Sequence, residues 1–177
     1  MVPSPPKKQK GEQAMKKDVK STFAKTVQRE LKKCGYDSFI GGSYRFGFEK
    51  GTSDVDIFVG VGTINDEYDG GYYLENKAGS IMEGIFFGIG KFSNSCASCD
   101  NSFIQYKIGT LVHINFYKGE DYDRIKEEHI LVEKYLNRHK LLKKMRVTAT
   151  SGTIFYQHIL DMAKQENFKM KGVKLSP

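Results

Sequence analysis

Residues 40–59 of this 177-residue chain constrain its fold more than any other segment. They run from the end of a short apolar segment, 39–40, through a glycine-rich turn into a second apolar segment, 55–59. The second segment is short and rich in β-branched residues, which favours a buried strand. Asp54 and Asp56 lie at its start, and side chains two residues apart on a strand point to the same face. The sequence therefore predicts two carboxylates side by side where this strand begins.

Two acidic side chains on one face repel each other unless a positive charge lies close to both. Divalent metals supply such a charge in many proteins, and hard oxygen ligands prefer Mg²⁺ or Mn²⁺. The pair Asp54 and Asp56 therefore predicts a Mg²⁺ (or Mn²⁺) site. The alternative is a surface strand whose acidic residues face solvent.

The turn before the acidic pair is suited to phosphate. Gly41 and Gly42 have no Cβ, so their backbone N–H groups can approach a phosphate closely. Ser43 adds a hydroxyl, and Arg45 adds a cation for the charge of a phosphate group. The alternative is a plain turn from a strand into a helix, with Ser43 as the N-cap.

These residues together resemble a known family. The order Gly42-Ser43, then Gly47, then Ser53-Asp54-Val55-Asp56 is similar to the signature of the DNA polymerase beta-like nucleotidyltransferase superfamily, and the chain looks most like its small single-domain members. The resemblance implies transfer of a nucleotide from a nucleoside triphosphate to a hydroxyl, with Asp54 and Asp56 as metal ligands. It implies nucleotide-binding roles for Gly42, Ser43, Arg45, Gly47 and Ser53, with Ser53 stabilising the turn.

The third acid of that family is missing at the expected place. The superfamily carries it on a later strand, which here reads L-V-H-I-N-F-Y over residues 111–117. His113 and Asn115 are the inward candidates, and the spacing to the residues that follow favours His113. A histidine can bind a softer metal or act as a base, but it does not replace the charge of a carboxylate. An acid from the loop 60–71 (Asp66, Glu67 or Asp69) is the other way to complete the site.

Two functions therefore remain open. The first is an active nucleotidyltransferase in which Asp54, Asp56 and His113 are catalytic. The second is a catalytically degenerate member that binds nucleotides or another protein, for example a phage regulatory module. The sequence does not identify the acceptor, which is a protein, a small molecule or a nucleic-acid end.

The expected fold is α/β (α+β): a small mixed β-sheet with helices packed on one side, followed by C-terminal helices. Hydrophobic spacing predicts helices over 16–34, 74–89, 121–139 and 151–164, and strands over 36–40, 55–59, 103–108 and 111–117. In the first helix the apolar stripe is Val19, Phe23, Val27 and Leu31. Residues 1–15 are expected to be a disordered basic leader, 16–166 one domain and 167–177 a polar tail.

The positive charge is concentrated at the N-terminus. Residues 1–33 hold ten Lys or Arg and three Asp or Glu, whereas the rest of the chain holds 18 of each sign. A neutral body argues against a large basic nucleic-acid face, but the basic N-terminal segment can still contact phosphates weakly. The sequence shows no membrane span or secretory signal, so we expect a cytoplasmic protein with reduced cysteines. Cys96 and Cys99 form a lone C-x-x-C pair, which is a weak zinc signal.

Overall fold

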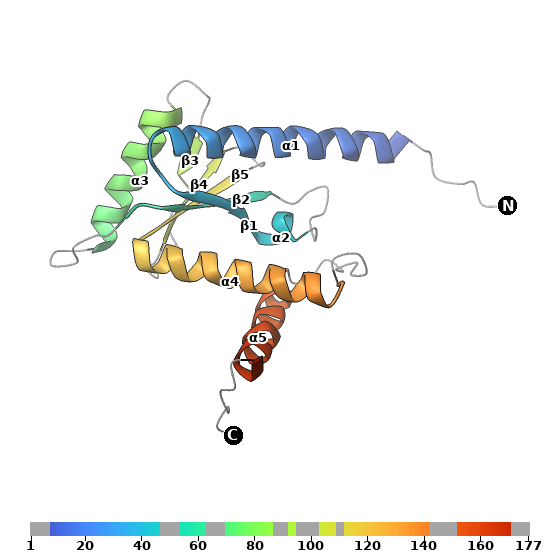
Figure 1. Ribbon diagram of the computed structural model, residues 1–177. Coiled ribbons are helices and arrows are strands. Elements are labelled where there is room, and N and C mark those ends of the chain that lie inside the picture. The colour runs from blue at the N-terminus through green and yellow to red at the C-terminus, as the bar shows by residue number, and fades with distance from the viewer. Residues whose placement is uncertain are drawn as a thin grey trace.

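The computed structural model describes residues 8–46, 54–62, 70–86, 92–94, 103–108, 112–141 and 152–170. These parts of the chain contain a five-stranded sheet with the order β1-β2-β5-β4-β3 (Figure 1). The central strands β2 and β5 are parallel, and every other neighbouring pair is antiparallel. The strands are β1 (Ser38–Gly41), β2 (Val55–Gly60), β3 (Phe92–Asn94), β4 (Phe103–Ile108) and β5 (Val112–Tyr117).

Helices lie on both faces of this sheet. Helices α1 (Lys8–Lys33) and α3 (Gly70–Phe86) pack on one face, and α4 (Gly119–Arg138) runs across the other. The short α2 (Gly42–Arg45) follows β1 directly, and α5 (Gly152–Met170) packs on α4 and points away from the sheet (Figure 1). The mixed α+β fold class is thus confirmed, with α1 and α3 together on one side and the C-terminal helix α4 on the other.

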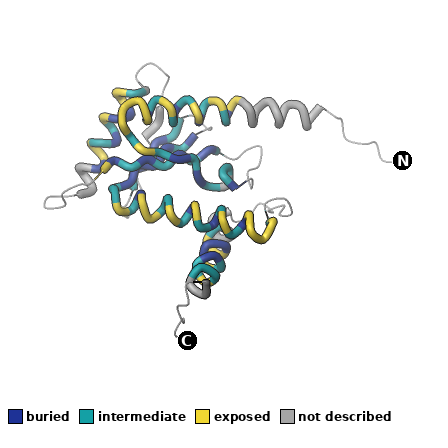
Figure 2. Tube along the Cα trace, in the orientation of Figure 1, coloured by how far each residue is buried: buried dark blue, intermediate teal, exposed yellow. Residues whose placement is uncertain are grey.

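Strand periodicity decides which residues enter the main core. In β2 the odd-numbered residues Val55, Ile57 and Val59 are fully buried, and they face the apolar stripes of α1 and α3. Figure 2 shows the sheet as the buried centre of the molecule, with exposed residues on the outer sides of the helices. Because alternate strand residues point to opposite faces, the even-numbered residues of β2 must point toward the side of α4. The acidic pair therefore lies on the α4 side of the sheet.

The second face is divided into an apolar and a polar half. Phe39, Phe58, Tyr117 and Tyr122 form a cluster under the first turns of α4. The rings of Phe39 and Phe58 stack at a centroid distance of 5.0 Å. Ring contacts extend from Phe58 through His129 to Phe46, which follows the Gly42 turn. The side chains of Asp54 and Asp56 remain 36% and 27% exposed, so the start of β2 lies at the margin of the covered area.

The fold differs from the expected elements in several places, among them the start of α3, which is Gly70 and not residue 74. Helix α1 begins at Lys8, inside the expected leader, because no proline lies between Pro6 and the end of this helix and residues 8–15 are mostly good helix formers. The short strand β3 was not expected, and it forms by pairing with β4. Helix α5 continues to Met170 because no glycine or proline interrupts it before Gly172. Val19 is 58% exposed, so the expected stripe on α1 is wrong at that residue.

The rest of the expected stripe on α1 lies on its buried side. Val27 and Leu31 are buried as expected, and Phe23 is partly buried against the main core. Lys20 and Ala24 are buried as well, so the buried side differs from the expected one only around residues 19–24. The periodicity thus predicted the helix, and contact with the sheet decided which residues of 19–24 are buried. No helix in the described ranges is both long and apolar enough to cross a membrane.

Candidate functional site

Three of the predicted site residues lie together on the α4 side of the sheet. β2 and β5 are parallel neighbours, and their register places Asp56 beside His113. The Nδ1 atom of His113 lies 2.7 Å from Oδ2 of Asp54 and 3.6 Å from Oδ1 of Asp56. All three side chains are partly exposed, between 19% and 36%. The predicted placement of both carboxylates on one face, with His113 next to them, agrees with this geometry.

The polar surface continues across β5 onto β4. The register pairs His113 with Lys107 and Asn115 with Gln105. The Nε2 group of Gln105 donates to Oδ1 of Asn115 over 2.8 Å. Asn115 is buried, so this hydrogen bond satisfies a polar group that would otherwise be costly. Asp56, His113 and Lys107 therefore form one row across β2, β5 and β4. Asn115 and Gln105 form a second row beside it, two residues further along β5.

Glycine is required at position 42. Its φ angle is +61°, a region that side chains with a Cβ rarely adopt. A Cβ at this position would lie 2.4 Å from Oδ2 of Asp56. The turn after β1 therefore presses its backbone against the Asp56 carboxylate, as the glycine-rich sequence indicates. Gly41 pairs with Asp56 across β1 and β2, which completes the contact.

His129 of α4 holds this turn in place. The Gly42 N–H donates to its Nε2 over 3.3 Å, and its Nδ1 lies 2.8 Å from the carbonyl oxygen of Ile125. Since Nε2 accepts, the proton is on Nδ1 and the ring is neutral. The hydroxyl of Tyr156 on α5 lies 3.2 Å from the same Nδ1 atom. The Gly42 N–H that the sequence offered to a phosphate is thus bound to His129.

Burial keeps His129 neutral. The side chain is 5% exposed and packs among the rings of Phe39, Phe46, Phe58 and Tyr156. Burial lowers the pKa of His129, and the hydrogen bond with the Ile125 carbonyl opposes this in part. The nearby Arg45 cation lowers the pKa further, against smaller opposing contributions from Glu128 and Asp56. A neutral imidazole can accept from Gly42, whereas a protonated one cannot.

Arg45 points toward α4. One guanidinium nitrogen is 2.7 Å from Oε2 of Glu133, and another donates weakly to the carbonyl oxygen of Ile40 over 3.4 Å. The guanidinium also lies 5.8 Å from the centre of the Phe39 ring. Arg45 therefore ties the α2 turn to α4, and a phosphate would have to compete with Glu133 for its charge.

The donor set suits a divalent cation only in part. Asp54 and Asp56 offer carboxylate oxygens on one face, and the close approach of Gly42 shapes one side of that space. Within the described ranges, however, no group of three or more His, Cys, Asp or Glu side chains is arranged to hold a metal. The Nδ1 atom of His113 is directed at Asp54 and is therefore not turned toward a space that both carboxylates share. The two carboxylates fit Mg²⁺, and His113 would have to turn for a third ligand to form.

Several predicted residues lie outside the described part of the chain. These are Gly47, Ser53, the loop acids Asp66, Glu67 and Asp69, and the pair Cys96 and Cys99. Ser43 lies in α2, and the structure describes only its backbone. Cys34 is described and is an exposed free cysteine.

Sequence reasoning missed His129 and Glu133. Both contact a turn almost 90 positions earlier in the chain, which local periodicity cannot detect. A signal was nevertheless present for His129. The buried residues of α4 are Tyr122, His129, Val132 and Leu136, so a histidine lies on an otherwise mainly apolar stripe. Such a histidine needs hydrogen-bond partners in the fold.

No known protein family model matches this sequence, and no curated protein matches it either.

Proposed function

We propose that this protein is a metal-dependent nucleotidyltransferase that moves a nucleotide from a nucleoside triphosphate onto a hydroxyl acceptor. The observation that carries the proposal is the placement of Asp54, Asp56 and His113 on one sheet face, beside a turn at Gly42 where a Cβ would clash with Asp56. The resemblance of Gly42-Ser43, Asp54 and Asp56 to the DNA polymerase beta-like superfamily also supports it.

Each residue has a physical role in this proposal. Asp54 and Asp56 would hold Mg²⁺ (or Mn²⁺), which when bound neutralises triphosphate charge and activates the attacking hydroxyl. Gly42 keeps the turn close enough for a triphosphate to reach both acids. His129 and Arg45 fix that turn through contacts with α4. His113 can accept a proton from the acceptor hydroxyl once it leaves Asp54.

Lys107 is a further candidate for phosphate charge. It pairs in register with His113, and the described residues include no ion-pair partner for it. An ammonium beside the acids would attract a triphosphate that arrives with its metal. Lys107 would thereby take the role that Arg45 cannot fill while it is bound to Glu133.

One observation favours a second function. The His113–Asp54 contact places a potential cation against the acids without any metal. A protein that binds a nucleotide or another protein without turnover would retain this arrangement. Such a module would bind a triphosphate without forming a product, or would bind no nucleotide at all.

The test is titration calorimetry with each of the four nucleoside triphosphates, with and without Mg²⁺, followed by product analysis. The proposal expects Mg²⁺-dependent binding and consumption that Asp56→Asn abolishes. Asp161→Asn removes the same charge on the exposed side of α5 and should change neither. Binding without consumption in the presence of cell extract supports the second function. Equal consumption by Asp56→Asn rules the proposal out.

A further inference from the structure

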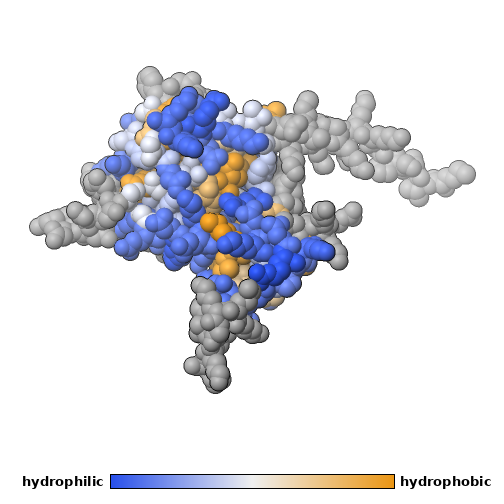
Figure 3. Space-filling model, in the orientation of Figure 1, coloured by the Kyte–Doolittle hydropathy of each residue, from blue (hydrophilic) through white to orange (hydrophobic). Residues whose placement is uncertain are grey.

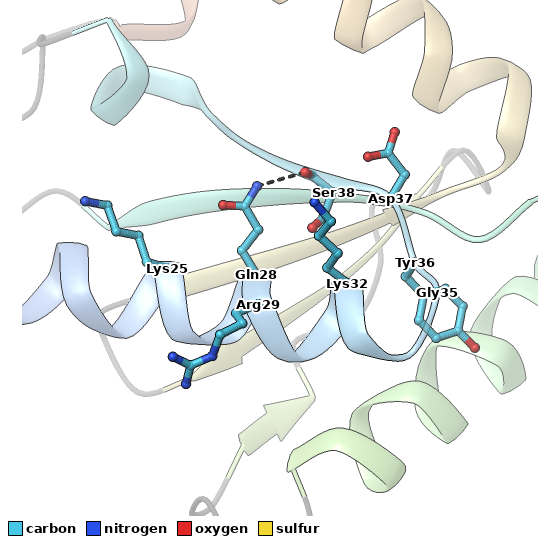
Figure 4. Close-up of a pocket in the computed structure, with 8 residues that line it drawn as sticks. All are labelled: Lys25, Gln28, Arg29, Lys32, Gly35, Tyr36, Asp37 and Ser38. Carbon is cyan, nitrogen blue, oxygen red and sulfur yellow. Dashed lines mark hydrogen bonds between the residues drawn. The ribbon is translucent and has the colours of Figure 1, made fainter.

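The second candidate surface is a groove of about 550 Å³ between α1 and the edge strand β1. It is lined by Lys25, Gln28, Arg29, Lys32, Gly35, Tyr36, Asp37 and Ser38 (Figure 4). This groove is separate from the acidic site. Ser38 pairs with Val59, three residues along β1 from the Gly41–Asp56 pair, or about 10 Å. Alternation also turns Ser38 toward α1, whereas Gly41 faces α4.

Positive charge dominates the groove. Lys25, Arg29 and Lys32 follow one another at helical spacing along α1, with Lys25 and Lys32 about 10 Å apart. Figure 4 shows Gln28 and Lys32 pointing from α1 toward β1, and Lys25 on the same side of the helix. Arg29 bonds Glu30, but the described residues include no ion-pair partner for Lys25 or Lys32. The one acid of the lining, Asp37, is already neutralised by Lys126 at 2.5 Å.

Two polar residues, Gln28 and Ser38, line the groove where α1 meets β1. Gln28 donates to the carbonyl oxygen of Ser38 over 2.8 Å, so a side chain occupies this acceptor on the free edge of the sheet. The buried hydroxyl of Ser38 has no hydrogen-bond partner among the described residues.

We propose that this groove binds the phosphodiester backbone of a nucleic-acid strand. Two lysines about 10 Å apart along α1, with no ion-pair partner among the described residues, match a ligand with repeated negative charges better than a single phosphate. Between residues 20 and 33 of α1 the apolar residues Ala24, Val27 and Leu31 are buried against the sheet, so this part of the helix offers no apolar face for insertion into a membrane. Figure 3 shows strongly hydrophilic surface over α1, in keeping with an ionic ligand. The groove binds without base contacts, so sequence has little effect on affinity.

The experiment is fluorescence anisotropy with labelled 20-nucleotide single strands and a 20-base-pair duplex, at several salt concentrations. The wild type and Lys25→Gln/Lys32→Gln are compared, and glutamine preserves helix propensity. Binding should weaken about tenfold in the double variant, and the salt slope should fall by about one per lysine. The two nucleic-acid forms show whether the groove prefers a flexible or a rigid backbone.

The matched control is Lys77→Gln/Lys134→Gln, which removes two charges from α3 and α4. It should bind like the wild type. Equal weakening in both double variants would mean that only net charge matters, and would overturn the proposal. So would absent binding at low salt, or binding to anionic phospholipid vesicles in preference to nucleic acid. None of these outcomes depends on nucleotide transfer, because the groove and the acidic site are separate.

Discussion

His129 Nε2 accepts a hydrogen bond from the Gly42 backbone N–H at 3.3 Å, which joins α4 to the turn beside the acidic pair. The same ring contacts Tyr156 of α5 through Nδ1. The geometry of the turn therefore depends on helices that the sequence places far downstream. Substitutions in α4 or α5 that alter His129 or Tyr156 should therefore change the position of the turn beside Asp56, even where the substituted residue contacts no ligand.

Gly42→Ala should be more damaging than an ordinary glycine substitution. The new Cβ meets Oδ2 of Asp56 at 2.4 Å and must also adopt a positive φ. We expect a loss of about 2–4 kcal/mol in the free energy of unfolding, because strain and a steric clash add. Urea denaturation measures this loss.

Gly35→Ala is the matched control. Gly35 also has a positive φ of 84°, but a Cβ there would meet nothing within 4 Å. It should cost only about 1 kcal/mol, the strain alone. Equal losses for the two variants would show that the turn does not press against Asp56.

Stability should fall on mild acidification because of His129. The pKa of His129 is lowered in the folded state by burial, while its unfolded value is about 6.5. The unfolded chain therefore takes up a proton first, and stability is lost as pH falls below about 6.5, down to the folded pKa. Urea midpoints at pH 7.5 and 5.5 should differ in the wild type, and His129→Gln should reduce this difference.

His158→Gln serves as the comparison, since His158 is exposed on α5. It should leave the pH dependence of the wild type intact. If His129→Gln keeps the full acid sensitivity, the neutral ring is not the cause. If His129→Gln lowers stability by the same amount at every pH, the effect of His129 comes from its packing and not from its protonation.

Glu133→Gln should release Arg45. The ion pair is 2.7 Å long but its side chains are 23% and 40% exposed, so solvent screens it and its loss should cost under about 1 kcal/mol. The freed guanidinium can then contact a bound triphosphate, and nucleotide affinity should rise about two- to fivefold. Titration calorimetry with Glu127→Gln as the control tests this. Weaker binding in Glu133→Gln would mean that Arg45 must be fixed on α4 to act.

His113→Asp should change the metal preference of the site. A carboxylate beside Asp56 adds a hard oxygen ligand, whereas the imidazole favours softer metals. We expect wild-type triphosphate binding to be stronger with Mn²⁺ than with Mg²⁺, and the variant to favour Mg²⁺ relative to the wild type. His113→Asn, which adds no charge, is the control. An identical ratio of Mn²⁺ to Mg²⁺ affinity in all three proteins would exclude His113 from the metal site.

The sequence predicted what depends on local pattern. Alternation in 55–59 placed Asp54 and Asp56 together, and spacing along 111–117 selected His113, which the register then set beside Asp56. It could not predict the start of α1, because residues 8–15 are mostly polar and show no apolar periodicity. Nor could it predict that on α4 the apolar Ile130 is 36% exposed while the neighbouring His129 is buried. Tertiary contact with β1 and α2 decided that choice.

Contacts far apart in sequence account for the rest. Arg45 was expected to bind phosphate, but its guanidinium group donates to Oε2 of Glu133, 88 residues later in the chain, over 2.7 Å. The groove beside β1 likewise arises only when α1 folds back along the sheet edge (Figure 4). Helical spacing alone places its lysines on an ordinary solvated face.

The most direct test of the central claim is label transfer. The protein is incubated with each α-labelled nucleoside triphosphate, Mg²⁺ or Mn²⁺, and a cell lysate as the source of acceptors, in parallel with Asp54→Asn/Asp56→Asn. We predict metal-dependent labelling of a macromolecule or small product by the wild type alone. Equal labelling by the double variant would contradict the claim. So would absent labelling combined with absent metal-dependent triphosphate binding.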